Sequence, residues 1–359
     1  MIEGISSSLA AIEGQAKGAL SSTDDALKTT GRVLGRRTPG YRVTLDGKDI
    51  TPSLNGRLID MSLTRQRGDY ADQVDITLSD ADGRLALPRR GVALWIALGW
   101  VDAGLVPRGQ FIVDEVEYSG APDQVTIRAR SANMREDLPT RRTQSWHKVL
   151  LGDVVKSIAA RNKLAVRVDS VLAGIRVAHL DRVDESDMNV LSRLGDNYGG
   201  VPVIAAGTLM FMRPGASTTA SGKAIPAISI KRSDGDRYRY SAIDRESFTG
   251  VKARWNHVSH GKTKEVIIGT TERLRTMQKT YASESDARLA ARAELDRAKR
   301  EAAQFSIDLA LAKPEMLIES PVILSGFKSE IDALRWVAVE IVERLSGNGY
   351  TAEIKCETR

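Results

Sequence analysis

The sequence predicts a mainly β chain in which two related β-barrel domains flank a central α/β domain. Three observations predict this fold: a two-residue apolar period in several segments, an order of elements that returns near the C-terminus, and helix-spaced apolar residues between these regions. The chain has 359 residues, with 42% hydrophobic and 27% charged residues. This length is too great for one ordinary core, and the composition is that of a folded protein, so we expect several domains.

Residues 1–38 are expected to form a helical or flexible appendage, because Ser, Ala, Gly and Thr are abundant and the segment runs into the breaker-like stretch GRRTPG. Apolar residues at the a/d spacing of a coiled-coil seam lie at its start: Ile2, Ile5, Leu9 and Ile12. Interspersed glycines weaken a free helix, so this seam is expected to need a partner. A flexible tail is the alternative.

The first barrel domain is expected over residues 39–138. Apolar and polar residues alternate over 41–46, before an Asp-Gly turn, and again over 74–79. The segment 92–100 is apolar on both alternating faces. One of these faces, which carries Trp95, therefore needs cover from a neighbouring domain or subunit.

The second barrel domain is expected over residues 246–359, with an inserted helix at 283–304. The strand-like segments of the first domain end with VTIRARS at 125–131. A second series with the same order ends with YTAEIKCE at 350–357. Ile127 and Ile354 take equivalent inward positions in these closing strands. An alanine-rich stripe ending at Phe305 predicts the inserted helix.

The central domain is expected over residues 139–245 and is α/β. Apolar residues at helical spacing predict amphipathic helices over 151–164 and from Ser186 to about 198. Residues 201–215 predict a hairpin that turns at Ala206 and Gly207, and a Ser/Thr/Gly-rich surface loop follows.

Charge and cysteine content exclude several classes of protein. A net charge of +6 comes from interspersed acidic and basic residues rather than a basic block, so no specific nucleic-acid binding is expected. Cys356 is the only cysteine, which rules out an internal disulfide and a thiolate-rich metal site. The sequence shows neither a membrane-spanning apolar run nor a secretory signal, so we expect no membrane binding and assembly in the bacterial cytoplasm.

Motifs for nucleotide or metal binding fail at the spacing that the chemistry needs. Asn256 occupies the position of the first glycine of a P-loop ending at Thr263, and His257 and His260 lie on a strand-like segment without a nearby acidic partner. The DADG turn at 80–83 lacks the glutamate that a calcium loop carries at its twelfth position, because that position is Gly91.

Residues for covalent or acid–base catalysis are equally weak. Asp114, Glu115 and Glu117 form a carboxylate cluster, but all three fall on one short strand, where they cannot flank a sugar. A G-x-S-x-G nucleophile motif is absent, and Cys356 lies at an inward strand position. We therefore predict a protein that is not an enzyme and that has no cofactor and no metal.

Two binding functions are alternatives. Residues 151–164 resemble the first helix of a peptidoglycan-binding LysM module, with a Gly-Asp opening and an Ile-Ala pair. The same stretch weakly resembles a helix-turn-helix of a DNA-binding regulator, but the second helix follows more than twenty residues later, which is too far for that motif.

Taken together, the segments from Tyr41 to Arg359 resemble the late control protein D family of contractile-tailed phages, tail hub proteins related to the hub portion of type VI secretion spike proteins. The order and spacing of nine segments carry the resemblance. They are RVTLDGKDIT (42–51), DGRLALPRRG (82–91) with ALGW (97–100), VDEVEYSGAPD (113–123) with IRARSANMRE (127–136), TRRTQSWH (140–147), LGDVVKSIAARN (151–162), DESDMNVLSRL (184–194) and DGDRYRY (234–240).

The resemblance implies a homotrimer whose six barrels form a pseudo-sixfold ring. That ring would adapt a sixfold tail tube to a threefold spike in the baseplate of a contractile phage tail or a phage-tail-like particle. Its implied partners are the tail spike protein, the tail tube or tube-initiator protein, the tape measure protein and other baseplate proteins. Candidate contacts with a second subunit or a partner are Ile2, Ile5, Leu9, Ile12, Trp95, Trp100 and Trp255; for each tryptophan, packing inside its own barrel is the alternative.

Overall fold

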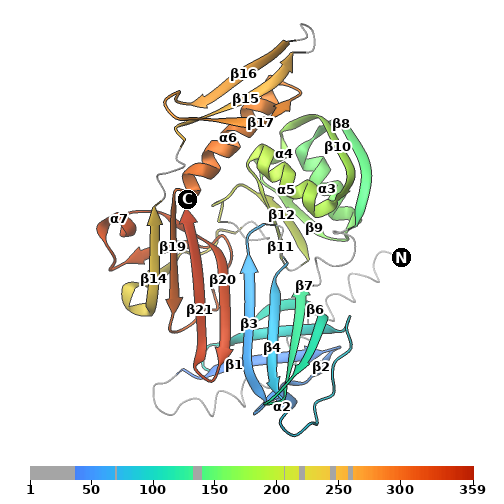
Figure 1. Ribbon diagram of the computed structural model, residues 1–359, viewed down its shortest axis with the longest axis vertical. Helices are drawn as coiled ribbons and strands as arrows, with labels where there is room; N and C mark the ends of the chain where they lie inside the picture. The colour runs from blue at the N-terminus through green and yellow to red at the C-terminus, as the bar shows by residue number, and fades with distance from the viewer. Residues whose placement is uncertain are drawn as a thin grey trace.

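The computed structural model describes residues 37–68, 71–131, 140–205, 207–217, 223–242, 248–257 and 262–359. Strands dominate, which confirms the prediction of a mainly β fold. Two β-units lie side by side in the lower half of Figure 1, with an α/β part and a small sheet carrying a long helix above them. The expected N-terminal seam of Ile2, Ile5, Leu9 and Ile12 lies outside the described residues.

The first β-unit is a curled sheet with strand order β3-β4-β7-β6-β5-β1-β2. Side chains from nearly all of its strands meet in one core, which includes Val43, Leu63, Ile76 and Leu98. Its elements are β1 (Pro39–Leu45), β2 (Lys48–Asp49), α2 (Thr51–Leu54), β3 (Leu58–Gln66), β4 (Gln73–Ser79), β5 (Ala93–Trp100), β6 (Gly104–Ser119) and β7 (Gln124–Ser131).

The second β-unit has its own core, in which Phe305, Trp336 and Ile354 are almost fully buried. Its elements are β13 (Ile228–Lys231), η2 (Arg232–Asp234), β14 (Gly235–Ala242), β18 (Ala303–Leu309), β19 (Pro321–Ser325), α7 (Ser329–Asp332), β20 (Trp336–Ser346) and β21 (Gly349–Thr358).

The two β-units repeat one strand order. Strands pair as β3-β4-β7-β6-β5 in the first unit and as β14-β18-β21-β20-β19 in the second, and every one of these neighbours is antiparallel. The segments VTIRARS and YTAEIKCE form β7 and β21, which occupy equivalent places in the two orders. The expected internal repeat is therefore present in the strand pairing.

The expected boundary between residues 245 and 246 does not follow the strand pairing. β13 and β14 precede it, yet β13 pairs with β19 and β14 pairs with β18. We place the start of the second β-unit near Ile228. Residues 248–301, which follow the expected boundary, instead form a separate insertion between β14 and β18.

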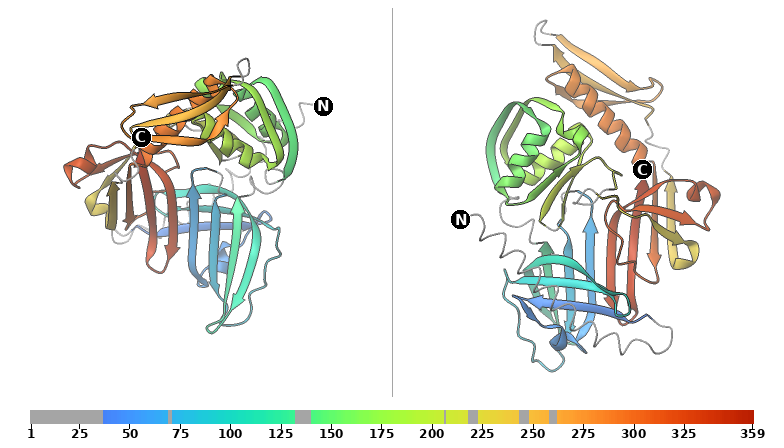
Figure 2. Two further views of the ribbon diagram at one scale, coloured as in Figure 1. Left: turned by 45° about the horizontal axis from the view of Figure 1, so that its top comes forward. Right: turned by 180° about the vertical axis from the view of Figure 1, so that it is seen from behind.

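The α/β part packs two helices against short strands around Ile158, Leu191 and Phe211. Figure 2 shows it as a compact body beside the long inserted helix. Its elements are β8 (Arg141–Leu150), α3 (Leu151–Arg161), β9 (Ala165–Val168), α4 (Ser170–Ala173), β10 (Arg176–Ser186), α5 (Asp187–Tyr198), β11 (Val201–Ala205) and β12 (Thr208–Met212). The two helices and the β11–β12 hairpin lie where the sequence predicts them.

The insertion is a three-stranded sheet with one face covered by α6 (Glu284–Glu301). Its strands are β15 (Gly250–His257), β16 (Lys262–Gly269) and β17 (Leu274–Tyr281). The expected helix at 283–304 is too long at its C-terminal end. Ala303 and Phe305 belong to β18, because residues 303–309 alternate between buried and less buried positions in pairing with β21.

Candidate assembly interface

The two β-units are joined by direct strand pairing between β3 and β20. Seven residue pairs, from Glu340 with Gln66 to Ser346 with Asp60, connect these antiparallel strands. The pairing makes one continuous sheet from the two units (Figure 1). Each backbone pairing satisfies groups that an open sheet edge would leave free, so the junction is a specific contact.

A buried ionic cluster crosses this junction. The carboxylate of Glu343, which is 1% exposed, accepts a hydrogen bond of 2.9 Å from Arg65 and one of 2.5 Å from Arg108. The hydroxyl of Tyr350 donates to the same carboxylate, and burial together with Glu343 raises the pKa of Tyr350 well above its usual value. Burial lowers the pKa of Arg65, against the opposing effect of Glu343. Removal of any one of these charged side chains would therefore leave a buried charge without one of its partners, which destabilises the fold.

A second cluster connects both β-units with the link to the α/β part. Arg67, just beyond β3, forms ion pairs with Glu319 and, at 2.7 Å, with Glu357. The other carboxylate oxygen of Glu319 accepts a hydrogen bond of 2.6 Å from the backbone N–H of Gly215. The segment that leaves β12 is thus held against the end of the continuous sheet.

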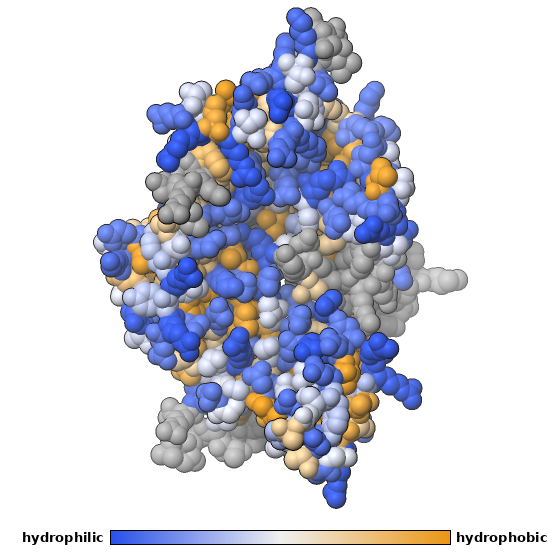
Figure 3. All heavy atoms as spheres, viewed as in Figure 1, coloured by the Kyte–Doolittle hydropathy of each residue, from blue (hydrophilic) through white to orange (hydrophobic). Residues whose placement is uncertain are grey.

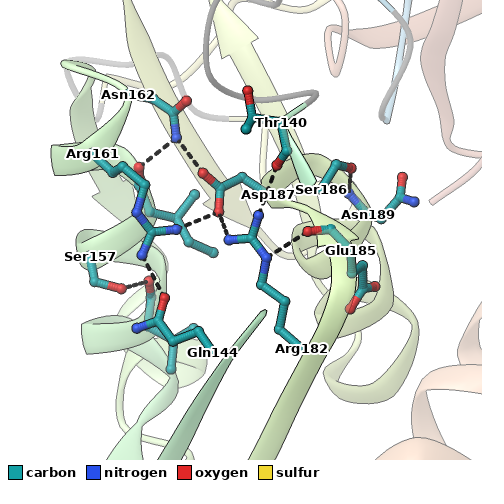
Figure 4. Close-up of polar contacts among 12 residues, drawn as sticks. Thr140, Gln144, Ser157, Arg161, Asn162, Arg182, Glu185, Ser186, Asp187 and Asn189 are labelled. Atoms are coloured by element: carbon teal, nitrogen blue, oxygen red, sulfur yellow. Dashed lines mark hydrogen bonds and ion pairs between the residues drawn. The ribbon is translucent and has the colours of Figure 1, made fainter. Parts of the chain in front are cut away.

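The α/β part is fixed internally by a carboxylate that is fully buried. Asp187 pairs with Arg182 and, at 2.8 Å, with Arg161, while Asn162 donates to its second oxygen at 2.9 Å (Figure 4). Arg182 also donates to the carbonyl of Thr140 at 3.0 Å. These charge-assisted contacts connect α3, α5 and β10 within the α/β part.

Among the sheet edges without a strand partner in the described part of the chain are those of β14 and of the C-terminal end of β6. β14 pairs only with β18, so its outer edge is free. β6 pairs with β5 only as far as Ile112, so the edge over residues 114–119 on that side meets no described strand. Exposed edges of this kind are sites for pairing with another chain.

The three tryptophans proposed as contacts lie in different environments. Trp95 on β5 is 50% exposed and so remains a candidate contact. Trp100 is 1% exposed, donates to the carbonyl of Ala312 at 3.1 Å and packs on Tyr350, so it belongs to the core and we no longer propose it as a contact. Trp255 is partly buried against the core under α6.

The carboxylate cluster on β6 is a salt-bridge ladder. Asp114 pairs with Arg130 at 3.2 Å, and Glu115 and Glu117 both pair with Arg128. Within the described ranges, no group of three or more His, Cys, Asp or Glu side chains has an arrangement that could hold a metal. None of the helices in the described part of the chain combines the length and hydrophobicity that a membrane-spanning helix requires.

The sequence analysis missed the residues of the junction. Glu343 carries a usable signal, because it takes the position between Ile341 and Leu345 on the apolar face of a strand-like segment. A carboxylate at such a position needs a buried cationic partner. The partners, Arg65 and Arg108, carry no comparable signal in their own segments.

A two-unit β fold with a built-in junction and free edges defines a structural component of an assembly. The family model for the phage tail baseplate hub (GPD) matches residues 85–349, and the chain belongs to this family. It is 40% identical over 362 residues to a probable baseplate hub protein of Escherichia phage P2, covering 90% of this chain and 94% of that protein. The corresponding protein of Escherichia phage 186 is 37% identical, with 89% and 93% covered. The chain is thus a baseplate hub protein of a phage tail.

Solved structures share the fold at low sequence identity. The 43 kDa tail protein of prophage MuSo2 from Shewanella oneidensis is 14% identical with a TM-score of 0.65, covering 89% of this chain and 98% of that one. A tail protein from Neisseria meningitidis has a TM-score of 0.66 at 14% identity, with 89% and 96% covered. A type VI secretion component of E. coli has a TM-score of 0.54 at 11% identity, covering 90% of this chain and 77% of that one.

Proposed function

We propose that three copies of this chain close into a ring that adapts a sixfold tail tube to a threefold spike. The repeated strand order carries the proposal, because three chains with two equivalent β-units each supply six similar units around one axis. A ring of identical subunits needs heterologous contacts, in which one surface of a subunit meets a different surface of the next. The free edges of β14 and β6 are such a pair of surfaces.

The contact between subunits would repeat the contact within the chain. Within the chain, β3 of the first unit pairs with the part of β20 that lies beyond β19. The equivalent strands are β14 and the part of β6 that lies beyond β5, and neither of these edges has a strand partner among the described residues. Pairing β14 of one subunit with β6 of the next would continue the sheet around the ring.

Charge favours the same pairing. β14 carries two exposed basic side chains, Arg237 and Arg239, and one exposed acidic side chain, Asp236. The charged side chains on the free edge of β6 are all acidic, namely Asp114, Glu115 and Glu117, and they also pair with arginines of β7. Opposite charges on adjacent strands favour pairing and disfavour the pairing of each edge with itself. The face in Figure 3 is mainly hydrophilic with scattered apolar groups, which suits subunits joined through strand edges and charge.

The two ends of the sheet differ in their symmetry. β3, β7, β14 and β21 all run in the same direction, since each is two antiparallel steps from the next. The turns that precede β7 and β21 therefore lie at one end, where a ring would present six similar turns to a sixfold tube. The α/β part and the insertion follow β7 and β14, at the other end, where they would occur three times and suit a threefold spike (Figure 1).

The role is one of assembly rather than turnover. We propose that the chain has no catalytic centre and that it assembles in the bacterial cytoplasm with the spike, tube, tape measure and other baseplate proteins of an infectious or tail-like particle. Support comes from the ion-paired state of the carboxylates on β6, which occupies them structurally.

Cysteine cross-linking tests the ring contact. One cysteine replaces Glu115 or Glu117 on β6 and a second replaces Arg237 or Arg239 on β14, giving four double variants. Neighbouring strands bring Cβ atoms within disulfide range, so we expect mild oxidation to give a covalent trimer in at least one of the four. Cys356 is 1% exposed and should not react.

In the control, one cysteine again replaces Glu117 and the other replaces Lys264 on β16, a strand of the insertion. It should give no covalent trimer. Trimers in this control together with none in the four edge pairs would contradict the proposed contact.

A further inference from the structure

A cleft lies at the end of the sheet where the α/β part and the insertion meet the second β-unit. It has a volume of about 630 Å³ and is lined by the exit of β12, the C-terminal half of α6 and the residue after β21. Four of its lining side chains are cationic, namely Arg213, Lys299, Arg300 and Arg359, against two carboxylates, Asp169 and Asp296. Clefts of this size can enclose most of a small ligand or the side chains of a short peptide.

Backbone contacts bring the cations together. The hydroxyl of Thr358 donates to the carbonyls of Lys299 and Arg300, at 3.2 and 2.9 Å, so the end of β21 is held against the last turn of α6. The side chain of Arg359 lies over Gly215, because a Cβ built there would meet Arg359 Cγ at 2.9 Å. Cations from three separate elements therefore surround one opening.

Three of the four cations have no direct ion pair within the described residues, although carboxylates lie near Arg300. Arg213 forms an ion pair with Asp169 at 3.0 Å. The side chains of Lys299, Arg300 and Arg359 form no hydrogen bond or ion pair with any described residue. Burial lowers the pKa of Arg300, and the nearby Arg67 lowers it further, against the opposing effects of the carboxylates of Glu357, Asp296 and Glu319. An anion bound beside Arg300 would offset this cost.

The helix dipole explains only part of the arrangement. The C-terminal end of a helix favours cations, which accounts for Lys299 and Arg300 in the last turn of α6. It does not account for Arg359 or Arg213, which come from other elements and face the same cleft. Met212 and Pro214 add an apolar wall, so the cleft offers more than a single anion contact.

We propose that this cleft binds an acidic peptide segment of the protein that docks on the inserted end of the hub. The inference rests on the proposed function, which places the threefold partner at that end. Arginine and lysine at several points of one cleft match the spaced carboxylates of Asp and Glu side chains, and the apolar wall packs against the peptide. Such a contact fixes the orientation and the rate of docking.

The test uses the full-length protein and fluorescein-labelled hexaglutamate as the probe, followed by fluorescence anisotropy at low salt. The double charge reversal Lys299→Glu/Arg300→Glu should weaken binding by about tenfold or more. The control is Arg292→Glu, a single charge reversal at an exposed position of the same helix outside the cleft, and Lys299→Glu and Arg300→Glu are also made singly so that equal changes in charge are compared. Arg292→Glu should weaken binding by less than about twofold, and Lys299→Arg/Arg300→Lys should bind like the natural chain.

Three results would overturn the inference: no binding of hexaglutamate, equal weakening by Arg292→Glu and by the cleft reversal, or displacement of the peptide by inorganic phosphate at the same molar concentration. The last would indicate a simple anion site. The trimer mass is measured on the same samples. A trimer without hexaglutamate binding would reject this inference alone, whereas a monomer would reject the proposed ring itself.

Discussion

Arg65 donates a hydrogen bond of 2.9 Å from Nη2 to Oε2 of Glu343, although the two residues are 278 positions apart in the sequence. Arg65 belongs to the first β-unit and Glu343 to the second, and both side chains are almost completely buried. The contact therefore connects the two repeats at the place where their sheets join. In the proposed ring, the equivalent strands β14 and β6 would meet between neighbouring subunits, so the intrachain junction would be the template for that contact.

Replacing Glu343 with Gln should destabilise the chain by about 3–5 kcal/mol, because two buried guanidinium groups lose their counter-ion. The measurement is the free energy of unfolding in urea. The control is Glu340→Gln on the same strand, which breaks the more exposed ion pair with Lys355 and should cost less than about 1 kcal/mol. Similar losses in the two variants would show that the buried cluster does not hold the units together.

Replacing Ile127 or Ile354 with Asp should unfold the β-unit that contains it. The two side chains are 8% and 1% exposed, and an unpaired buried carboxylate costs several kcal/mol against a typical total stability of about 5–15 kcal/mol. Limited proteolysis locates the unfolded unit. Thr351→Asp, opposite Arg344 on the neighbouring strand, is the control and should stay folded. Equal protease resistance in all variants would refute the assignment of these positions to the cores.

Asp72 should make stability depend on pH. Burial raises its pKa from 3.8 to about 6, against the opposing effect of Arg65. Between these values the folded chain binds more protons than the unfolded chain, so this group reduces stability as pH rises from about 4 to 6, and the loss then stays constant. Asp72→Asn should remove this pH dependence. The stability of the variant minus that of the natural chain should be about 1 kcal/mol larger at pH 8 than at pH 4, a value that allows for the partial exposure of Asp72.

Urea unfolding midpoints of both proteins at pH 4, 6 and 8 check this prediction. A difference between the two proteins that does not change with pH would show that Asp72 has an ordinary pKa. A difference that grows toward low pH would reverse the predicted sign.

Deleting residues 1–20 should leave the trimer intact but prevent attachment of the tube or the tape measure protein. We propose that the seam of Ile2, Ile5, Leu9 and Ile12 gathers near the axis of the ring and is buried there by a tail partner. Burial could supply up to about 1.5–3 kcal/mol for each side chain before the entropy of ordering is subtracted. The readouts are solution mass and electron microscopy of tails. Normal tails from the deletion would show that the segment is dispensable.

The elements of the fold were predictable where their signal is local. Val74, Ile76 and Leu78 alternate with polar residues, and β4 has this pattern of burial. Other elements lack such a signal. β14 is an exposed edge strand with the polar sequence GDRYRYSA, so its place in the second unit could not be recognised from periodicity. The end of α6 was misplaced because Ala298, Ala302 and Phe305 continue the helical spacing of apolar residues into the start of β18.

The assembly surfaces were less predictable than the elements. The pairing of β3 with β20 joins positions about 280 residues apart. The sequence of a polar strand edge does not show which other strand it pairs with. The burial of Trp100 depends on Ala312 and Tyr350, which come from the other half of the chain. The cleft likewise draws on three distant elements, so its cations carried no common pattern.

The solution mass of the purified chain tests the central claim most directly. Light scattering after gel filtration should give about 117 kDa, three times the 39.1 kDa of this chain. Proline at Tyr118 or at Tyr238 should convert the trimer to monomer without unfolding it. The strand register points the backbone N–H groups of these two residues to the free edges, and their side chains are 52% and 46% exposed. A natural chain that stays at 39.1 kDa over the whole accessible concentration range, or a dimer, would contradict the ring.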